Sequence, residues 1–211
     1  MNFAELHNHY KSLQIESHLV DVIEKGEKFV YPSGHHLEPG VGFVYFIIEG
    51  SLSISVAGSE LSIGNAIEHM PIGLMERYCP LVDFEYTSMT PITVIKLSWE
   101  DFDNIFIYAT PERVIELVTI LIYMTVFSLD LHFERKQASS YQTIRPMLFR
   151  YLYRTQTHKN EKEGLAAFII RRTNLSRTHV FRVLADLKEG GYITVEKGKL
   201  VSINKTLPDD Y

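Results

Sequence analysis

Short apolar runs separated by glycine, proline and asparagine fill residues 20–98. Leucine, isoleucine and valine alternate with serine over residues 52–56, and residues 44–48 are rich in β-branched and aromatic side chains, so both segments are predicted to be strands. Gly50 and Gly58 stand where such strands need turns. The pattern predicts a small antiparallel β-barrel or sandwich, within an effector-type domain of residues 1–110.

A helical pattern begins after Thr110. Threonine is a good helix cap and Pro111 suits the first helical position, so a helix is predicted within residues 111–138, ending near Lys136. Residues 117–129 are apolar on almost every side, but this stretch has 13 residues. A bilayer span needs roughly 20 apolar residues. We therefore expect burial on more than one side and no membrane partner.

The same helix carries apolar residues on a second face, beyond those needed to cover the strands. A monomer would leave that face in water, so we predict that it forms the seam of a homodimer. The residues assigned to this dimerisation helix seam are Ile115, Val118, Ile122, Met124, Val126 and Leu129.

Residues 139–211 are predicted to form a module of helices and a hairpin. After a helix over residues 141–156, the sequence GLAAFIIRRT is an amphipathic helix, and Asn174 in the following turn tolerates the left-handed conformation. Ser176 suits the N-cap of the next helix, which ends at two glycines. Alternating residues on both sides of EKGK then predict a hairpin. Together these elements predict a winged helix-turn-helix, a DNA-binding module.

Charge divides the chain in a similar way. Residues 1–144 hold 8 Lys+Arg against 19 Asp+Glu, a balance of −11, whereas residues 145–205 hold 13 against 5, a balance of +8. A solvated basic face is the simplest reading of such an excess. Together with the predicted module, however, the basic segment indicates a nucleic-acid reader attached to a sensing or oligomerising domain. Double-stranded DNA is therefore the expected partner.

The C-terminal sequence SRTHVFRVLADLKEGGYITVEKGKLVSIN resembles the DNA-binding domain of the Crp/Fnr transcriptional regulators. The residues that carry the resemblance are Ser176, Arg177, Val180, Arg182, Leu184 and Leu187. The resemblance implies an α+β fold with an N-terminal antiparallel β-barrel like that of cyclic-nucleotide-binding proteins, a long dimerisation helix and a C-terminal winged helix-turn-helix. The segments YITVEKGKLVSIN and SSYQTIRPMLFRYLYR look more narrowly like the enterobacterial inhibitors of hydrogen peroxide resistance, which implies a role in oxidative-stress control.

Two departures from the family pattern restrict what the resemblance implies. The acidic base-reading residue after the first arginine is replaced by Thr178, so the family's usual operator is not expected. Cyclic-nucleotide sensors of the family carry a Gly-Glu pair and, further along, an Arg-Ser/Thr that holds the phosphate. Here Gly73 precedes Leu74, and residues 81–85 supply two carboxylates that would repel a phosphate. We expect no cyclic nucleotide and no other cofactor.

Eight residues are expected to contact DNA. Arg177 and Arg182 lie on the exposed face of the second motif helix and suit guanine edges. Ser176, Arg171 and the two hairpin lysines flank that face and suit phosphates. The complete set is Arg171, Ser176, Arg177, Thr178, His179, Arg182, Lys197 and Lys199.

The interior of the strand-rich domain leaves two alternatives open. It is either packed solid or it encloses a pocket for an apolar molecule such as a fatty acyl chain. A solid core is favoured, because aromatic residues on strands are more often core than pocket. The candidate lining residues are Phe43, Tyr45, Phe46, Leu74, Phe84 and Tyr86.

A cupin-like enzyme built on the strand-rich domain is the main alternative function. Such enzymes need metal-binding histidines and carboxylates on the strands, where only His69 is expected. His7, His9 and His18 fall in a predicted N-terminal tail, and no metal site is assigned. The chain is therefore expected not to be an enzyme.

Cysteine usage and the N-terminus bear on the compartment. Cys79 is the single cysteine, which excludes an internal disulfide. An exposed Cys79 could be a redox sensor, but a lone cysteine is more often a buried small hydrophobe, which is the expectation here. The first residues lack the basic start and apolar block of a secretory signal. We expect a cytoplasmic protein.

Overall fold

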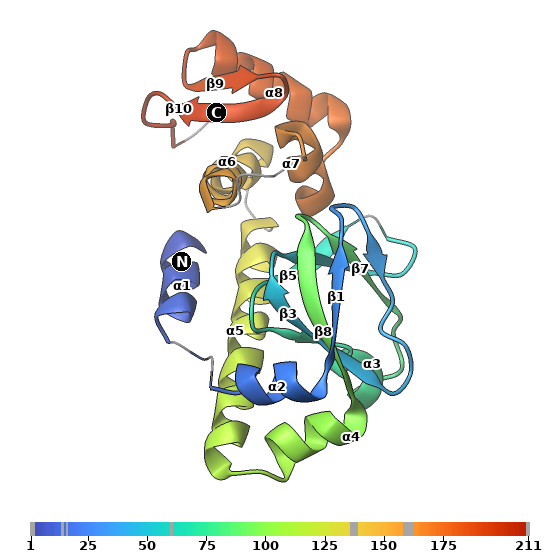
Figure 1. Ribbon diagram of the computed structural model, residues 1–211. Helices are drawn as coiled ribbons and strands as arrows, with labels where there is room; N and C mark the ends of the chain where they lie inside the picture. The colour runs from blue at the N-terminus through green and yellow to red at the C-terminus, as the bar shows by residue number, and fades with distance from the viewer. Residues whose placement is uncertain are drawn as a thin grey trace. The chain divides into compact units, whose positions relative to one another are not determined.

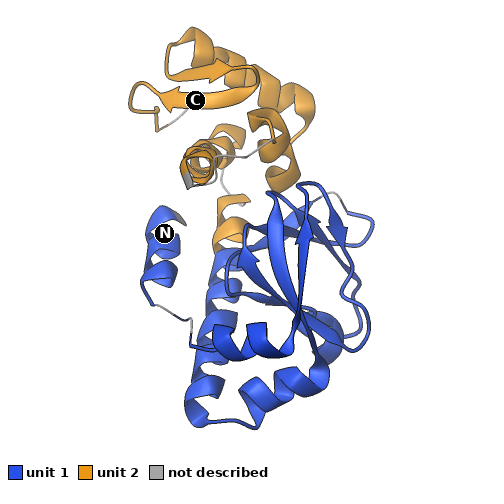
Figure 2. Ribbon diagram, in the orientation of Figure 1, with its two compact units in different colours: residues 1–129 blue, residues 130–211 orange. Residues whose placement is uncertain are grey.

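The computed structural model describes residues 3–13, 15, 17–59, 61–135, 139–157 and 163–209. The chain divides into two compact units, residues 1–129 and residues 130–211 (Figure 2). Each unit has a hydrophobic core of its own. The predicted antiparallel domain, long helix and C-terminal helix-turn-helix are all present (Figure 1).

The first unit combines strands with helices that lie before, between and after them in the chain. The helices are α1 (Phe3–Ser12), α2 (Leu19–Lys25), α3 (Leu74–Tyr78), α4 (Trp99–Phe102), the π-helical turn η1 (Asp103–Ile107) and α5 (Pro111–Arg135), whose last residues belong to the second unit. The strands are β1 (Glu27–Tyr31), β2 (His36–Leu37), β3 (Phe43–Glu49), β4 (Leu52–Val56), β5 (Ser62–Ala66), β6 (Pro71–Ile72), β7 (Phe84–Ser88) and β8 (Ile92–Ser98).

The strands form two antiparallel sheets of four strands each. One sheet has the order β1-β8-β3-β6 and the other β2-β7-β4-β5. The two sheets share one core but are not hydrogen-bonded into a closed barrel. The expected barrel is therefore a sandwich, the alternative that the strand pattern also allowed. The short edge strands β2 and β6 leave too few backbone pairs to close the ring.

Strand β3 is buried on both faces, which explains its nearly continuous apolar sequence. Tyr45 and Ile47 belong to the core between the two sheets. Val44 and Phe46 belong to a second cluster on the other face of the same sheet, where Phe106 of η1 stacks on Phe46 at 5.3 Å between ring centroids. The first sheet is therefore covered by strands on one side and by helices on the other.

The N-terminal residues are helical, so the prediction of a tail was wrong. His7 of α1 and His18 before α2 are 3% and 0% exposed. The ring centroid of Tyr10 lies 5.2 Å from that of Tyr123 and 6.2 Å from that of Phe127, both on α5. Helices as short as α1 and α2 are stabilised by such packing rather than by their own propensity, which is why the sequence pattern gave no signal.

Helix α5 begins where the sequence predicts. Thr110 Oγ1 accepts a hydrogen bond from the amide of Arg113 at 3.4 Å. The helix is long and apolar enough to cross a membrane by length and composition alone, and 28% of its most apolar window is buried. Ile120 and Phe127 pack into the core between the sheets. Much of the remaining apolar surface of α5 is therefore exposed.

In the part of the second unit that the structure describes, there are three further helices and a hairpin. These are α6 (Ser140–Thr157), α7 (Leu165–Thr173), α8 (Arg177–Glu189), β9 (Ile193–Glu196) and β10 (Lys199–Ile203). Their apolar faces meet in one core, where Tyr151 and Phe168 make an edge-to-face contact. Arg150 of α6 is buried and ion-paired with Asp130 and Glu134, at the end of α5. These pairs attach the last turns of α5 to this unit.

The turn between β9 and β10 has two residues, Lys197 and Gly198. Their φ angles are 49° and 78°. A type I′ turn requires positive φ at both central positions, and glycine adopts such angles freely. Lysine does not, so Lys197 holds a conformation that is unfavourable for its residue type.

Candidate nucleic-acid interface

The connection between α7 and α8 is dictated by local sequence. Asn174 follows the last residue of α7 with φ 49° and ψ 18°, the left-handed conformation that asparagine tolerates. Ser176 caps α8, because its Oγ accepts a hydrogen bond from the amide of His179 at 3.3 Å. Helix α8 ends at Gly190. These features confirm the predicted helix-turn-helix.

Helix α8 has one buried and one exposed face. The buried face consists of Val180, Val183 and Leu187. Most of the expected DNA contacts of this helix are exposed: Ser176, Arg177, Thr178 and Arg182, with His179 half-buried. The helix N-terminus adds a partial positive charge beside Arg177. The first half of α8 therefore exposes positive charge on one face, while the opposite, apolar face packs into the core of the second unit.

Phe181 also lies on the exposed face of α8, although it was not among the expected contacts. It is 58% exposed. The sequence held a signal for this, because Phe181 breaks the helical spacing that Val180, Val183 and Leu187 share. A large apolar residue outside the buried stripe is therefore displayed between the two exposed arginines.

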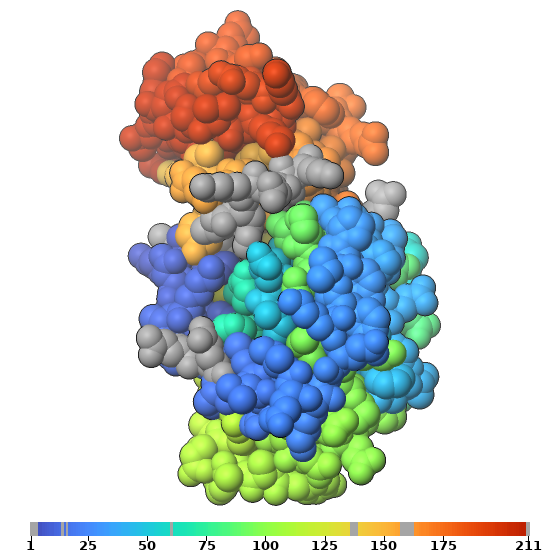
Figure 3. All heavy atoms as spheres, viewed as in Figure 1, coloured from blue at the N-terminus to red at the C-terminus, as the bar shows by residue number. Residues whose placement is uncertain are grey.

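The hairpin, which is red in Figure 3, brings two further cations to the surface of the second unit. Lys197 and Lys199 are exposed on either side of Gly198. Gly198 also accepts a hydrogen bond from the amide of Leu165 at 2.8 Å, which ties the hairpin turn to the start of α7. The hairpin is thus a fixed wing of this unit.

Arg171, one of the expected DNA contacts, is ion-paired within the second unit. Its Nε lies 3.5 Å from Oε1 of Glu163, and its side chain is 40% exposed. Glu163 also pairs with Arg154 and Arg172, at 3.4 Å each. Such a pair lowers the charge that Arg171 presents, so its contact with a phosphate would be weaker than that of a free arginine.

Arg172 is buried within the same cluster and has a structural role that the sequence did not reveal. Its guanidinium lies 3.9 Å from the ring centroid of Phe168. Burial lowers the pKa of Arg172 to about 9, against the opposing charge of Glu163. The residue therefore remains charged at neutral pH, and its ion pair with Glu163 and its contact with Phe168 hold α7 in the second unit.

The expected seam residues on α5 fall into two groups. Four are well exposed: Ile115 (65%), Val118 (47%), Ile122 (55%) and Leu129 (47%). They follow one another at intervals of three, four and seven residues, the spacing of a coiled-coil seam. Met124 and Val126 are half-buried, and Met124 packs against the core between the sheets.

The six candidate pocket residues are not gathered in one place. Phe43, Tyr45, Phe84 and Tyr86 belong to or pack against the core between the sheets. Phe46 and Leu74 belong to the cluster on the opposite face of the first sheet. A single cavity lined by all six would have to pass through the sheet.

The segment after Gly73 carries an acidic side chain, Glu76, that is bonded within the first unit. Tyr86 donates a hydrogen bond from its hydroxyl to Glu76, 2.8 Å from Oε1. Burial, together with the Glu76 charge, raises the pKa of Tyr86, so the phenol stays protonated. Arg77 makes a bidentate ion pair with Asp103 at 2.8 and 2.6 Å. The arginine closest to this segment is therefore already neutralised.

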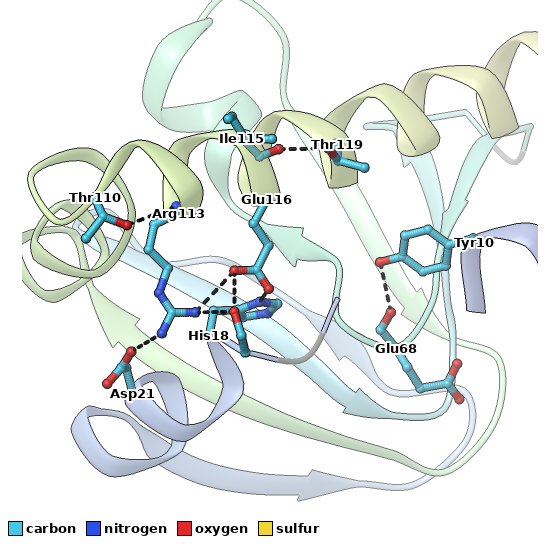
Figure 4. Close-up of polar contacts among 10 residues, drawn as sticks. Tyr10, His18, Asp21, Glu68, Thr110, Arg113, Ile115, Glu116 and Thr119 are labelled. Atoms are coloured by element: carbon cyan, nitrogen blue, oxygen red, sulfur yellow. Dashed lines mark hydrogen bonds and ion pairs between the residues drawn. The ribbon is translucent and has the colours of Figure 1, made fainter. Parts of the chain in front are cut away.

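A polar network joins the start of α5 to α2 (Figure 4). His18 and Arg113 both bond to Glu116, and Arg113 also contacts Asp21 at 2.6 Å. Beside it lies an open depression of about 390 Å³ that Ile115 helps to line. The sequence gave no indication of this network.

The histidines and the cysteine that could take part in metal or thiol chemistry do not gather in one place in the described ranges. Among these residues no group of three or more His, Cys, Asp or Glu is placed to hold a metal ion. His69 lies in a turn with φ 69°, not on a strand. Cys79 is exposed, so the expectation that it is buried was wrong. It follows α3 directly, and the loop leaves no core beside it.

Comparisons with known proteins agree with this geometry. Residues 140–209 match the family described as winged helix-turn-helix DNA binding. A segment of 73 residues is 41% identical to the inhibitor of hydrogen peroxide resistance from Escherichia coli K12 and 40% identical to that from Salmonella typhimurium LT2, covering 35% of this chain. The match spans 34% of these relatives' own length.

Similarity to solved structures extends over most of the chain. The c-di-GMP-responsive global regulator CLP of Xanthomonas campestris superposes with a TM-score of 0.69 at 16% identity, over 89% of this chain and 99% of that one. A regulator of the Crp/Fnr family from Eubacterium rectale gives 0.68 at 11% identity, over 90% and 91%. At such identities the similarity concerns the fold.

Proposed function

We propose that this chain is a homodimeric transcriptional regulator that binds double-stranded DNA. It has the fold of the Crp/Fnr transcriptional regulators and a winged helix-turn-helix at its C-terminal end. The observation that carries the proposal is the division of α8 into a buried apolar face and an exposed basic one. A helix of this kind fits the major groove of B-DNA.

Two kinds of contact follow from the positions of the basic residues. Arg177 and Arg182 on the exposed face of α8 reach base edges, where arginine pairs with guanine in a bidentate manner. Ser176, with Thr178 and His179 beside it, begins the helix and meets phosphate through the helix N-terminus. Lys197, Lys199 and Arg171 hold phosphates on the flanks and position the helix.

The exposed stripe on α5 supports the homodimer. Its coiled-coil spacing matches a second copy of itself across a two-fold axis. Two copies would carry two recognition helices, which read half-sites one turn of DNA apart, roughly 34 Å. The operator is therefore a near-palindrome. A protein that regulates transcription in this way works in the cytoplasm, where the chromosome lies.

The first unit does not bind a cyclic nucleotide by the phosphate mode of the family. Glu76 occupies the segment after Gly73 and is engaged by Tyr86. Residues 79–98 contain no arginine that could neutralise a phosphate. Whether the core between the sheets admits an apolar molecule is a separate question, which extraction and mass spectrometry of bound lipid would answer.

The regulated process is proposed from the relatives. Their name, inhibitor of hydrogen peroxide resistance, links them to oxidative stress. The similarity covers about a third of the chain, so the same role for this chain is our proposal. The structural neighbours are regulators, which agrees with a non-enzymatic role for this chain.

Sequencing the DNA recovered with the protein from cells tests the proposal. The expected result is a set of sites that share a near-palindromic sequence and lie at promoters. A gel-shift titration against fragmented genomic DNA, beside the same titration of an Arg177→Ala variant, then separates specific from general binding. Recovery of DNA without a shared sequence would contradict the proposed function.

A further inference from the structure

Phe181 is displayed to solvent on α8, although it is a large apolar residue. It is 58% exposed, whereas Val180 before it and Val183 after it are fully buried. The helix could place a polar residue at this position without disturbing the core, because the buried stripe lies on the other side. The fold of the second unit therefore gives no reason for a phenyl ring here.

The surroundings of Phe181 suit a polyanion. At 3.6 residues per turn, Arg177 and Thr178 lie one turn before it on the same side of the helix, and Arg182 is its neighbour in the chain. All three are exposed. An apolar protein partner would have to bury these arginines without counter-charges, at a high desolvation cost. A DNA duplex supplies the counter-charges.

The major groove offers one apolar group, the C5-methyl of thymine, and phenylalanine is among the side chains that contact it. We infer that Phe181 determines specificity in the proposed operator by packing against a thymine methyl beside the bases that Arg177 and Arg182 read. This inference rests on the proposed function. It predicts that thymine is preferred over cytosine at that position, since cytosine lacks the methyl group.

Replacing thymines of the selected operator one at a time by deoxyuridine tests the inference directly. The replacement removes the methyl group and leaves the base pair intact. Burial of one such group corresponds to about 0.8 kcal/mol, which is about fourfold in Kd. We expect that loss at one or two thymines in each half-site, and no effect elsewhere.

The Phe181→Ala variant should bind the native operator more weakly and should no longer distinguish thymine from uracil at those positions. Phe149→Ala is the matched control, because Phe149 is 53% exposed on α6. It should keep the thymine preference in full. Phe181→Leu should keep part of it, and far-ultraviolet circular dichroism should show that all three variants fold.

Two results would overturn the inference while leaving the proposed function intact. One is a wild-type protein that binds its operator and depends on Arg177, but is indifferent to every thymine methyl. The other is a Phe181→Ala variant with the same thymine-to-uracil difference as the wild type. A wild-type protein that selects no DNA sequence at all would instead remove the proposed function, and the inference with it.

Discussion

The imidazole Nδ1 of His18 donates a hydrogen bond to Oε1 of Glu116 at 2.7 Å. The imidazole is fully buried, and burial lowers the pKa of His18 below its usual value. Burial opposes the ionisation of Glu116 as well, but hydrogen bonds from His18, Ser17 and Arg113 hold the pKa of Glu116 low. The pair is therefore a neutral histidine bonded to a carboxylate, and it fixes the N-terminal segment to α5.

Acid should destabilise the first unit through this pair. A folded-state pKa below the unfolded value means that the unfolded chain binds more protons. The contribution of His18 is complete above its unfolded pKa of about 6.5 and is lost as the pH falls towards the folded value. The pKa of Glu116 is also lowered in the folded state, so protonation of Glu116 at lower pH removes its contribution to stability as well. We expect the melting temperature to fall between about pH 7.5 and pH 5.

The His18→Asn variant separates titration from hydrogen bonding. An asparagine amide can still donate to Glu116 but does not titrate, so the melting temperature should depend less on pH. His36→Asn is the matched control, because His36 is exposed. Equal pH dependence in His18→Asn and the wild type, measured by differential scanning calorimetry, would show that another group governs acid stability.

Arg177 and Lys199 are expected to affect DNA binding in different ways. Arg177→Ala should cost about 1–3 kcal/mol on the operator and relax the sequence preference at one position. Lys199→Ala should weaken binding to all sequences alike and reduce the slope of log K against log salt by about one. Fluorescence anisotropy at several salt concentrations measures both effects. If neither variant changed operator binding, the assignment of α8 and the wing would be wrong.

Ile122 lies at the centre of the exposed stripe on α5, so a charge there should prevent dimerisation. Ile122→Glu would place a carboxylate opposite its own copy across the two-fold axis, where it is unpaired. Light scattering should then give the mass of one chain, against two for the wild type. Leu81→Glu, at a site that is 86% exposed on a loop, should remain dimeric. A monomeric wild-type protein at micromolar concentration would contradict the seam.

Cyclic AMP should not bind to the first unit. The Asp83 and Glu85 carboxylates would repel the phosphate, and residues 79–98 contain no arginine to neutralise it. Isothermal titration calorimetry should show no heat of binding. Saturable binding that persists in an Asp83→Ala, Glu85→Ala double variant would disprove the electrostatic argument.

The helices and turns of the second unit could be predicted from the sequence, because its turns are encoded locally. Asn174 in the left-handed conformation, the Ser176 cap and the glycines after α8 each act within a few residues. The apolar stripe of α8 is equally local. No distant contact is needed to interpret these features, so a single sequence suffices.

The first unit was predicted only in outline, because its details depend on residues far apart in the chain. His18 is buried by Phe46 and Phe106 and bonded to Glu116, none of which is near it in sequence. The separation of the strands into two sheets depends likewise on long-range pairing. Cys79 was misjudged for the same reason, since its exposure is a property of the loop around it.

Folding and DNA binding favour different residues at the tip of the wing. The left-handed conformation of Lys197 would suit asparagine better, and Asn-Gly is the preferred pair for this type of turn. Lys197→Asn should raise the free energy of unfolding of the second unit by roughly 0.5–1 kcal/mol. The same change removes a cation and should weaken binding to every DNA sequence, as anisotropy titrations would show. A more stable variant with unchanged affinity would mean that Lys197 does not contribute to DNA binding. A more stable variant with lower affinity would mean that Lys197 lowers the stability of the turn and strengthens DNA binding.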